Sequence, residues 1–168
     1  MSETTLRIVV IGGSSGIGLA VAKLCTARSA AVTIVGRDRR KLDEAIATLG
    51  PSTIGEAADA SDRVALDALF TRIRTIDHLV LAASGGAGAG SFGKIEPEGL
   101  RRGFEAKFGV HWSAAQSALP YMAPTGSITF ITAASSRLAN PGTSGLAQST
   151  GHSNEWYRRW RVNSRPSA

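Results

Sequence analysis

Glycine recurs where an apolar run meets a helical pattern near the start of the chain. The stretch VVIGGSSGIG (9–18) puts Gly12 at the end of the run and Gly16 and Gly18 at the opening of the pattern. Glycine is needed where the backbone must approach a ligand closely, because a side chain would block the approach. Free N–H groups at a helix N-terminus favour an anion. The spacing therefore predicts a site for the pyrophosphate of a dinucleotide.

Short apolar runs that are rich in β-branched residues predict the strands that position this turn. The first run, LRIVVI, has no polar alternation after its arginine and is typical of a strand buried on both faces. The predicted strands cover residues 6–11, 31–36, 52–59, 77–83 and 126–134, the third being the poorest.

Helical periodicity separates these runs. We expect helices over 16–28, over 37–50 with Gly50 at its end, and over 61–74 with Ser61 or Asp62 as its cap. One or two further helices are expected within 97–122, the longer ending near Pro120 to Pro124. Strands that alternate with helices predict an α/β fold, a Rossmann-like doubly wound parallel sheet.

The motifs, taken in order, resemble those of the short-chain dehydrogenase/reductase family. The family fingerprint T-G-x-x-x-G-x-G matches at Gly12, Gly16 and Gly18, with Ile11 in place of the usual threonine. The resemblance covers about residues 6–147. It implies an NAD(P)-binding Rossmann-like domain over 1–147 and hydride transfer between a nicotinamide and a carbonyl or alcohol.

The resemblance also implies a preference for NADP(H), with NAD(H) as the alternative. In GRDRRKL, Gly36 removes the acidic residue that would bind a ribose 2′-hydroxyl, and Arg37 would pair with a 2′-phosphate, helped by Ser14 or Ser15. A guanidinium suits phosphate, which an acid would repel. The other interpretation of Arg37 is a solvated arginine at the start of a helix.

Further cofactor contacts follow from the same resemblance. Asp59 stands where the family places an aspartate against the adenine amino group, although a helix cap is the alternative. LAAS (81–84) replaces the family's N-N-A-G, so small residues remain while the asparagine amides are absent. The candidate cofactor-binding residues are Gly12, Ser14, Ser15, Gly16, Ile17, Gly18, Arg37, Asp59, Ala60, Ala83 and Ser84.

The family's proton-transfer pair is missing. Family members use a tyrosine that protonates the substrate oxygen and a lysine four residues later that lowers its pKa. Tyr121 is followed at that spacing by Thr125, and Tyr157 by Arg161. The chain therefore resembles an atypical branch that lacks the Tyr-x-x-x-Lys pair, and whether it is an active enzyme stays open.

Two residues remain as catalytic candidates. The family's helical asparagine falls on Lys107, which could hold cofactor or substrate or could be an ordinary helix-surface residue. Ser135 lies just beyond the position of the family's serine and is the best surviving hydroxyl, with a turn serine as the alternative. The glycine-rich loop 84–93 is either a surface connection or a mobile segment over a substrate cleft. No metal site is expected, and a multi-cysteine zinc site is excluded because Cys25 is the only cysteine.

Composition bounds the partners and the compartment. The net charge is +6, and half of it comes from the four arginines after residue 147, less one glutamate. The rest of the chain is only mildly basic, which is weak evidence for binding to nucleic acid. No apolar run approaches a membrane span, the start lacks a signal peptide, and one cysteine suits a reducing cytoplasm. We expect a cytoplasmic protein with a small-molecule carbonyl or alcohol substrate, forming a homo-oligomer in its full-length form.

The tail 148–168 does not continue the family pattern, and the last units of the fold are expected to be missing or altered. One legal back-translation of it, read two bases later, encodes VNGALERVVPPLAGELAPVRV, which looks like the missing helix. The middle base of each shifted codon is the first base of a true codon, and the protein sequence nearly fixes that base. Since the middle base largely decides whether the encoded residue is apolar or polar, the choice of synonymous codons had little influence on the apolar pattern. We therefore interpret the tail as an out-of-frame product, against the alternative of a basic, aromatic patch for nucleic acid or anionic membrane.

The first function hypothesis is an NADP(H)-dependent oxidoreductase, and the absence of the family's tyrosine and lysine leaves open whether this form is active. The second is an NADP(H)-binding pseudoenzyme or regulatory module. The third is an interaction fragment that acts through WYRRWR near the end of the chain.

Overall fold

The computed structural model describes residues 5–84, 90 and 92–133. The chain divides into two compact units, and each is described by itself. Unit 1 comprises Met1–Ala83 and Val110–Ile131, and unit 2 comprises Ser84–Gly109 and Thr132–Ala168.

Unit 1 contains a five-stranded sheet in the order β3-β2-β1-β4-β5, and every neighbouring pair is parallel. The chain adds β2 and β3 on one side of β1 and then crosses back to add β4 and β5 on the other side, as in a doubly wound sheet. The predicted Rossmann-like fold class is confirmed. The strands are β1 (Arg7–Ile11), β2 (Ala31–Gly36), β3 (Ile54–Ala57), β4 (Ile76–Leu81) and β5 (Met122–Phe130).

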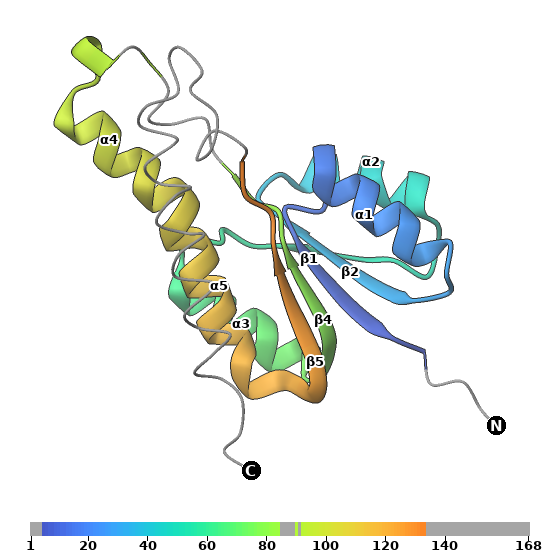
Figure 1. Ribbon diagram of the computed structural model, residues 1–168. Helices are drawn as coiled ribbons and strands as arrows, with labels where there is room; N and C mark the ends of the chain where they lie inside the picture. Colours follow the sequence, from blue (N-terminus) through green and yellow to red (C-terminus); the bar gives the residue numbers. More distant parts are fainter. Residues whose placement is uncertain (1–4, 85–89, 91, 134–168) are drawn as a thin grey trace. The chain divides into compact units, whose positions relative to one another are not determined.

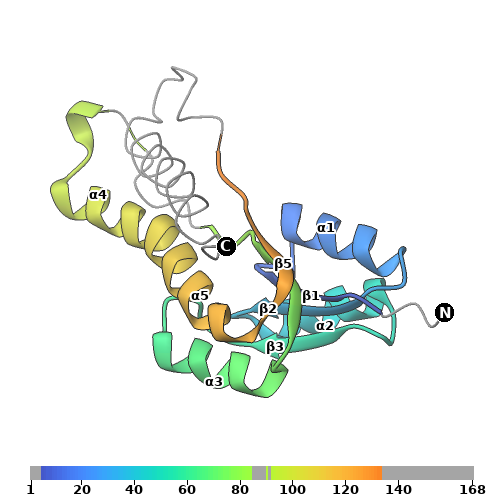
Figure 2. The ribbon, with the colours of Figure 1, turned by 60° about the horizontal axis from the view of Figure 1, so that its bottom comes forward.

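Helices cover both faces of this sheet. Figures 1 and 2 show α1 (Gly16–Thr26) and α2 (Arg39–Leu49) on one face, and α3 (Arg63–Ile73) and α5 (Val110–Ala118) on the other. Successive residues of a strand point to opposite faces, so β1 serves two cores. Ile8 and Val10 pack with the α1 and α2 side, whereas Val9 and Ile11 pack with the α3 and α5 side. This explains why β1 has an unbroken apolar sequence.

The first four predicted strands and the first three predicted helices agree with the structure to within two residues at each end. Gly50 ends α2 with a φ of 100°, a conformation that favours glycine. Of the two proposed caps for α3, the structure selects Asp62, whose side chain accepts hydrogen bonds from the N–H groups of Val64 and Ala65.

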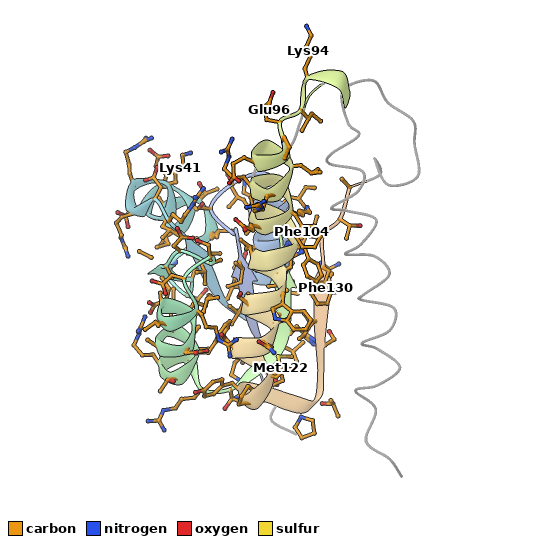
Figure 3. The ribbon with its side chains drawn as sticks, turned by 90° about the vertical axis from the view of Figure 1, so that its left-hand side faces the viewer. Lys41, Lys94, Glu96, Phe104, Met122 and Phe130 are labelled. Atoms are coloured by element: carbon orange, nitrogen blue, oxygen red, sulfur yellow. The ribbon has the colours of Figure 1, made fainter. Side chains whose placement is uncertain are left out.

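The last strand differs from its prediction. β5 starts at Met122 and ends at Phe130, at opposite ends of the strand in Figure 3, whereas the sequence predicted a strand over 126–134 after a helix reaching Pro120 to Pro124. Helix α5 ends at Ala118, and a 3-10 turn, η3 (Leu119–Tyr121), leads directly into the strand. An irregularity of register between Ile76 and His78 accommodates the early residues of β5, including Pro124.

Unit 2 contributes a 3-10 turn and the first part of the helical stretch between β4 and β5. Its elements are η1 (Phe92–Lys94), α4 (Pro97–Phe104) and a π-helical segment, η2 (Glu105–Gly109). Pro97 occupies the first turn of α4, where a missing N–H costs no hydrogen bond. The rings of Phe104 and Phe108 contact each other with centroids 4.9 Å apart.

Candidate functional site

The turn between β1 and α1 brings backbone against backbone. Gly12 has a φ of 83°, and a Cβ there would lie 2.6 Å from the backbone nitrogen of Ala83. A Cβ at Gly18 would collide with the carbonyl oxygen of Gly12. Two of the predicted glycines, Gly12 and Gly18, are therefore required by the close packing of this turn.

Helix α1 begins without a side-chain cap. Ser15 has the extended backbone of an N-cap residue, but its hydroxyl accepts no hydrogen bond from the first turn. The side chain of Asp38 caps α2, and that of Asp62 caps α3. In α1 the backbone N–H groups of the first turn are thus left to another acceptor, and the helix dipole favours an anion there.

The first residues of α1 are open. A Cβ at Gly16 would meet nothing within 4 Å, although the φ of 55° favours glycine. The Ile17 side chain is 61% exposed. Both residues fit a surface that a ligand could cover.

Ser14 and Gly36 approach each other where β1 and β2 end. The hydroxyl oxygen of Ser14 lies 3.0 Å from the position that a Cβ would take at Gly36. Arg37 follows Gly36 directly and is exposed. A hydroxyl and a guanidinium with no acid between them form a suitable setting for a phosphate.

Asp59 follows β3 at the same edge of the sheet. Its Oδ1 accepts hydrogen bonds from the backbone N–H of Ser61 at 2.9 Å and from the Ser61 hydroxyl at 2.7 Å. These bonds, with a smaller contribution from the Arg37 charge, lower the pKa of the Asp59 carboxyl. Because Asp62 caps α3, Asp59 is not the helix cap that the sequence left as its alternative. The side chain of the neighbouring Ala60 packs into the core.

Ala83 is held by a histidine that the sequence did not select. His111 is fully buried, and its Nε2 lies 3.0 Å from the carbonyl oxygen of Ala83, so the N–H at Nε2 donates. Since Ala83 also abuts Gly12, this bond fixes the backbone that supports the glycine turn. The one-turn spacing from Lys107 to His111 was visible in the sequence, but nothing local indicated the partner 28 residues away.

In unit 2, the Lys107 ammonium donates to the hydroxyl of Ser84 over 3.3 Å. Lys107 is only 8% exposed, and burial lowers its pKa. The interpretation of Lys107 as a helix-surface residue is therefore wrong. It lies in the π-helical segment, a kind of helix that is frequent at functional sites.

Tyr121, the tyrosine that the structure describes, is not placed to supply the missing acid. The Tyr121 hydroxyl hydrogen-bonds the Thr71 hydroxyl at 2.8 Å, and Tyr121 precedes β5, at the amino edge of the parallel sheet. The glycine turn and Arg37 lie at the carboxyl edge. Tyr157, Ser135 and most of the loop 84–93 lie outside the described residues.

The described residues contain neither a cluster suited to a metal ion nor a helix suited to a membrane. In residues 5–84, 90 and 92–133, no three His, Cys, Asp or Glu side chains gather as they would around a metal ion. Over the same residues, no helix is both long and apolar enough to cross a membrane.

The known proteins to which the chain is similar in sequence are a dehydrogenase family, an oxidoreductase and a protein with a reductase part. A family model described as "short chain dehydrogenase" matches residues 7–161. The chain is 34% identical over 132 residues to the oxidoreductase asL5 of Sarocladium schorii, covering 76% of this chain and 53% of that protein. It is 38% identical over 99 residues to the PIGF/3-ketodihydrosphingosine reductase fusion protein of Schizosaccharomyces pombe, covering 54% and 20%. The chain thus spans about half the length of the first relative and a fifth of the second.

Solved structures give the same picture. A short chain dehydrogenase/reductase family protein superposes with a TM-score of 0.85 at 27% identity, covering 97% of this chain and 70% of that one. A short-chain type dehydrogenase/reductase from Mycobacterium ulcerans has a TM-score of 0.86 at 22% identity, covering 97% and 64%, which is a likeness of fold.

Proposed function

Because this chain belongs to the short-chain dehydrogenase family, we propose that it is an oxidoreductase that transfers hydride between NADP(H) and a carbonyl or alcohol substrate. The observation that carries the proposal is the uncapped N-terminus of α1 next to a glycine turn with no room for side chains. An anion is the natural partner of such a turn.

The residues of unit 1 fit a phosphorylated dinucleotide. The diphosphate would bind the N–H groups of Gly16, Ile17 and Gly18, and Arg37 with Ser14 would bind the ribose 2′-phosphate. The free Oδ2 side of the Asp59 carboxyl would accept from the adenine amino group. When bound, the nicotinamide supplies hydride chemistry, and the chain's own residues hold the dinucleotide, exclude water and move the proton.

The names of the curated relatives support the reaction class. One is an oxidoreductase, and the other contains a 3-ketodihydrosphingosine reductase. The second name specifies the reduction of a keto compound, which is a reaction that hydride transfer from NADPH can perform. We propose carbonyl reduction as the direction to be tested first.

The absence of a Tyr-x-x-x-Lys pair from the printed sequence favours a second candidate. A chain without that pair could retain the dinucleotide site while reducing nothing. It would then be an NADP(H)-binding pseudoenzyme, whose bound nucleotide serves regulation.

A binding titration followed by turnover separates these candidates. We expect the nicotinamide fluorescence of NADPH to change on binding, with a lower Kd than for NADH, and NADPH to be consumed with a panel of aldehydes and ketones. Binding without consumption would favour the pseudoenzyme. If a demonstrably folded chain bound neither nucleotide, both candidates would fail.

We further propose that the protein is cytoplasmic and forms a homo-oligomer in its full-length form. A single cysteine suits a reducing compartment, and family members often associate. Fractionation of cells with an antibody to the chain tests the compartment.

The segment 148–168 carries a separate proposal, that it is encoded out of frame. The family match itself continues to residue 161, and the segment lies outside the described residues. Sequencing the encoding DNA around residue 147 decides the matter, because a sequence unable to encode VNGALERVVPPLAGELAPVRV in the shifted frame excludes it.

A further inference from the structure

His111 brings a side chain of α5 to the end of β4. It lies in the first turn of α5 and is fully buried, and its Nε2 donates to the carbonyl oxygen of Ala83 over 3.0 Å. Both residues belong to unit 1, which also contains the glycine turn. The bond therefore joins two elements of one unit across 28 positions of the chain.

The segment that receives this bond has few groups of its own to hold it. The parallel pairing of β4 with β1 ends at Leu81, and one further bond, from the Ala82 N–H to the Ile11 carbonyl oxygen at 2.9 Å, continues it. Leu81, Ala82 and Ala83 carry no polar side-chain atom. Backbone carbonyls in a protein interior are normally hydrogen-bonded. The His111 imidazole supplies such a bond at Ala83, where the strand pairing of β4 has ended.

Ala83 is in turn the surface against which the glycine turn packs. A Cβ at Gly12 would lie 2.6 Å from the Ala83 nitrogen and 2.8 Å from its Cα, so the two backbones are in direct contact. The Gly12 carbonyl occupies the space that a Cβ of Gly18 would need in the first turn of α1. Close-packed interiors transmit displacements. A shift of Ala83 would therefore reach the N-terminus of α1 through two backbone contacts.

Histidine is a costly choice for the place that it occupies. Around it on α5, Val110, Ala114 and Ala115 belong to the apolar core, and its ring centroid lies 6.1 Å from that of Phe130. A polar ring in such surroundings is tolerated only when it is hydrogen-bonded, and an apolar side chain of the same shape can be equally stable. We take the histidine as a sign that the position of one particular carbonyl matters.

We propose that His111 is a positioning residue for the dinucleotide. By holding the Ala83 carbonyl it fixes the support of the glycine turn, and so the direction in which the first N–H groups of α1 meet the diphosphate. The inference rests on the proposed binding of NADP(H). Because NADPH and NADH share their diphosphate, the contribution of His111 should be equal for the two nucleotides, unlike that of Arg37.

The binding test compares two substitutions in the full chain. His111→Leu removes the donor, and we expect it to raise the Kd of both NADPH and NADH by about 10-fold, the effect of one lost hydrogen bond. His111→Gln keeps a terminal N–H donor, so its two Kd values should lie within about threefold of the wild type. A failure of His111→Gln to restore binding, or unequal losses of the two nucleotides in His111→Leu, would overturn the proposal.

A ligand without a diphosphate separates the positioning of the turn from a general disturbance of the site. Adenosine 2′-monophosphate can use Arg37 and Asp59 but has no diphosphate to place on the N-terminus of α1. Its inhibition constant, measured in competition with NADPH, should be the same for His111→Leu as for the wild type. Equal losses for this ligand and for NADPH would mean that the whole site is disturbed, which contradicts a role in positioning the turn.

Phe70→Leu is the matched control for stability. Phe70 is fully buried in the core cluster on the same face of the sheet as α5, but it lies in the last turn of α3, just before β4 begins at the amino edge of the sheet. We expect this variant to have a lower free energy of unfolding and unchanged Kd values for both nucleotides. If Phe70→Leu raised the Kd values as much as His111→Leu does, stability and not the hydrogen bond would control affinity, and the proposal would fail.

NMR spectroscopy of the wild-type chain tests the contact even if a variant does not fold. The ¹⁵N-labelled imidazole of His111, assigned through its Phe130 neighbour, should carry a proton at Nε2, and NADPH should shift its signals. The signals of His78, which bonds Ser127 near the amino end of β4, should not move. A His111 ring without a proton at Nε2, or one that does not respond to saturating NADPH, would overturn the proposal.

The outcomes distinguish this inference from the function on which it rests. Wild-type Kd values in His111→Leu would overturn the role of His111 and leave the NADP(H) site standing. A folded wild-type chain that binds neither nucleotide would overturn both.

Discussion

Arg37 is the side chain that should separate NADPH from NADH. Arg37 is exposed and directly follows Gly36 at the end of β2, the Ser14 hydroxyl lies 3.0 Å from the Cβ position of Gly36, and Gly36 puts no acidic side chain there. Hydrogen bonds to a charged group contribute about 1.5–3 kcal/mol. We therefore expect Arg37→Ala to weaken NADPH binding by about 10- to 100-fold and to leave NADH binding nearly unchanged. Fluorescence titration with both nucleotides measures this difference.

Arg40→Ala is the control for that measurement. Arg40 lies on α2, three residues after Arg37, and its side chain is 72% exposed. Its Nη1 pairs with Glu44 at 2.6 Å. Loss of this surface pair should affect neither nucleotide. Equal losses of NADPH and NADH affinity in Arg37→Ala would contradict a specific phosphate contact.

Lys107 should make the free energy of unfolding depend on pH in the alkaline range. Its pKa is lowered by burial in the folded chain and is ordinary, near 10.5, in the unfolded chain. Between these two values the unfolded chain binds more protons, so the free energy of unfolding rises with pH through that window. At pH values below both pKa values, the buried ammonium of Lys107 is charged and its desolvation destabilises the folded state fully.

Lys107→Met should therefore be more stable than the wild type at neutral pH, by on the order of 1–2 kcal/mol. The difference should shrink as pH rises towards 10.5. Urea unfolding of both chains from pH 7 to 10.5 measures it. A variant less stable than the wild type at pH 7 would mean that the ammonium has a structural partner.

The β1–α1 turn allows two glycines to be compared. Gly18 has no space for a Cβ, since the obstacle is the Gly12 carbonyl, which cannot move like a flexible side chain. Gly16 has open space and only a φ of 55° to argue against a side chain. We expect Gly18→Ala to cost about 3 kcal/mol through overpacking and Gly16→Ala about 1 kcal/mol through backbone strain. Urea unfolding distinguishes them, and equal losses would count against the tight packing at Gly18.

Local patterns predicted the elements up to β4 because each has its own signal. The apolar runs stop at glycine or aspartate, and the Asp62 and Gly50 boundaries come from hydrogen bonds within a few residues. The start of β5 was predicted too late because a proline such as Pro124 normally interrupts a strand. Among the described residues β5 pairs only with β4, and an edge strand with a register irregularity tolerates a proline.

The site was predictable to the extent that it is local. The glycine turn and Arg37 follow strands whose carboxyl ends must share one edge of a parallel sheet. The contact of Lys107 with Ser84 joins residues 23 apart, and that of His111 with Ala83 joins residues 28 apart. The first depends on a π-helical segment that shifts the phase of the helix, and no periodicity of 3.6 residues indicates such a shift.

At the scale of the whole molecule, the side of β5 that has no partner strand among the described residues should govern association. In the described part of the chain β5 has a strand on one side only, and its second half, GSITF, is uncharged with β-branched residues. Exposed strands of this kind pair with other chains unless a charge prevents it. We expect the sedimentation coefficient to rise with concentration over tens of micromolar.

Thr129→Lys should reduce that association. Thr129 is an exposed residue in the paired part of β5, opposite Val80 of β4, so a lysine there adds a charge to this strand without removing a core side chain. Thr48→Lys on α2 adds the same charge at an exposed position away from β5 and should associate like the wild type. Sedimentation velocity on the three chains separates an edge effect from one of net charge. If Thr48→Lys disperses the chain as well as Thr129→Lys does, general repulsion and not strand pairing controls association.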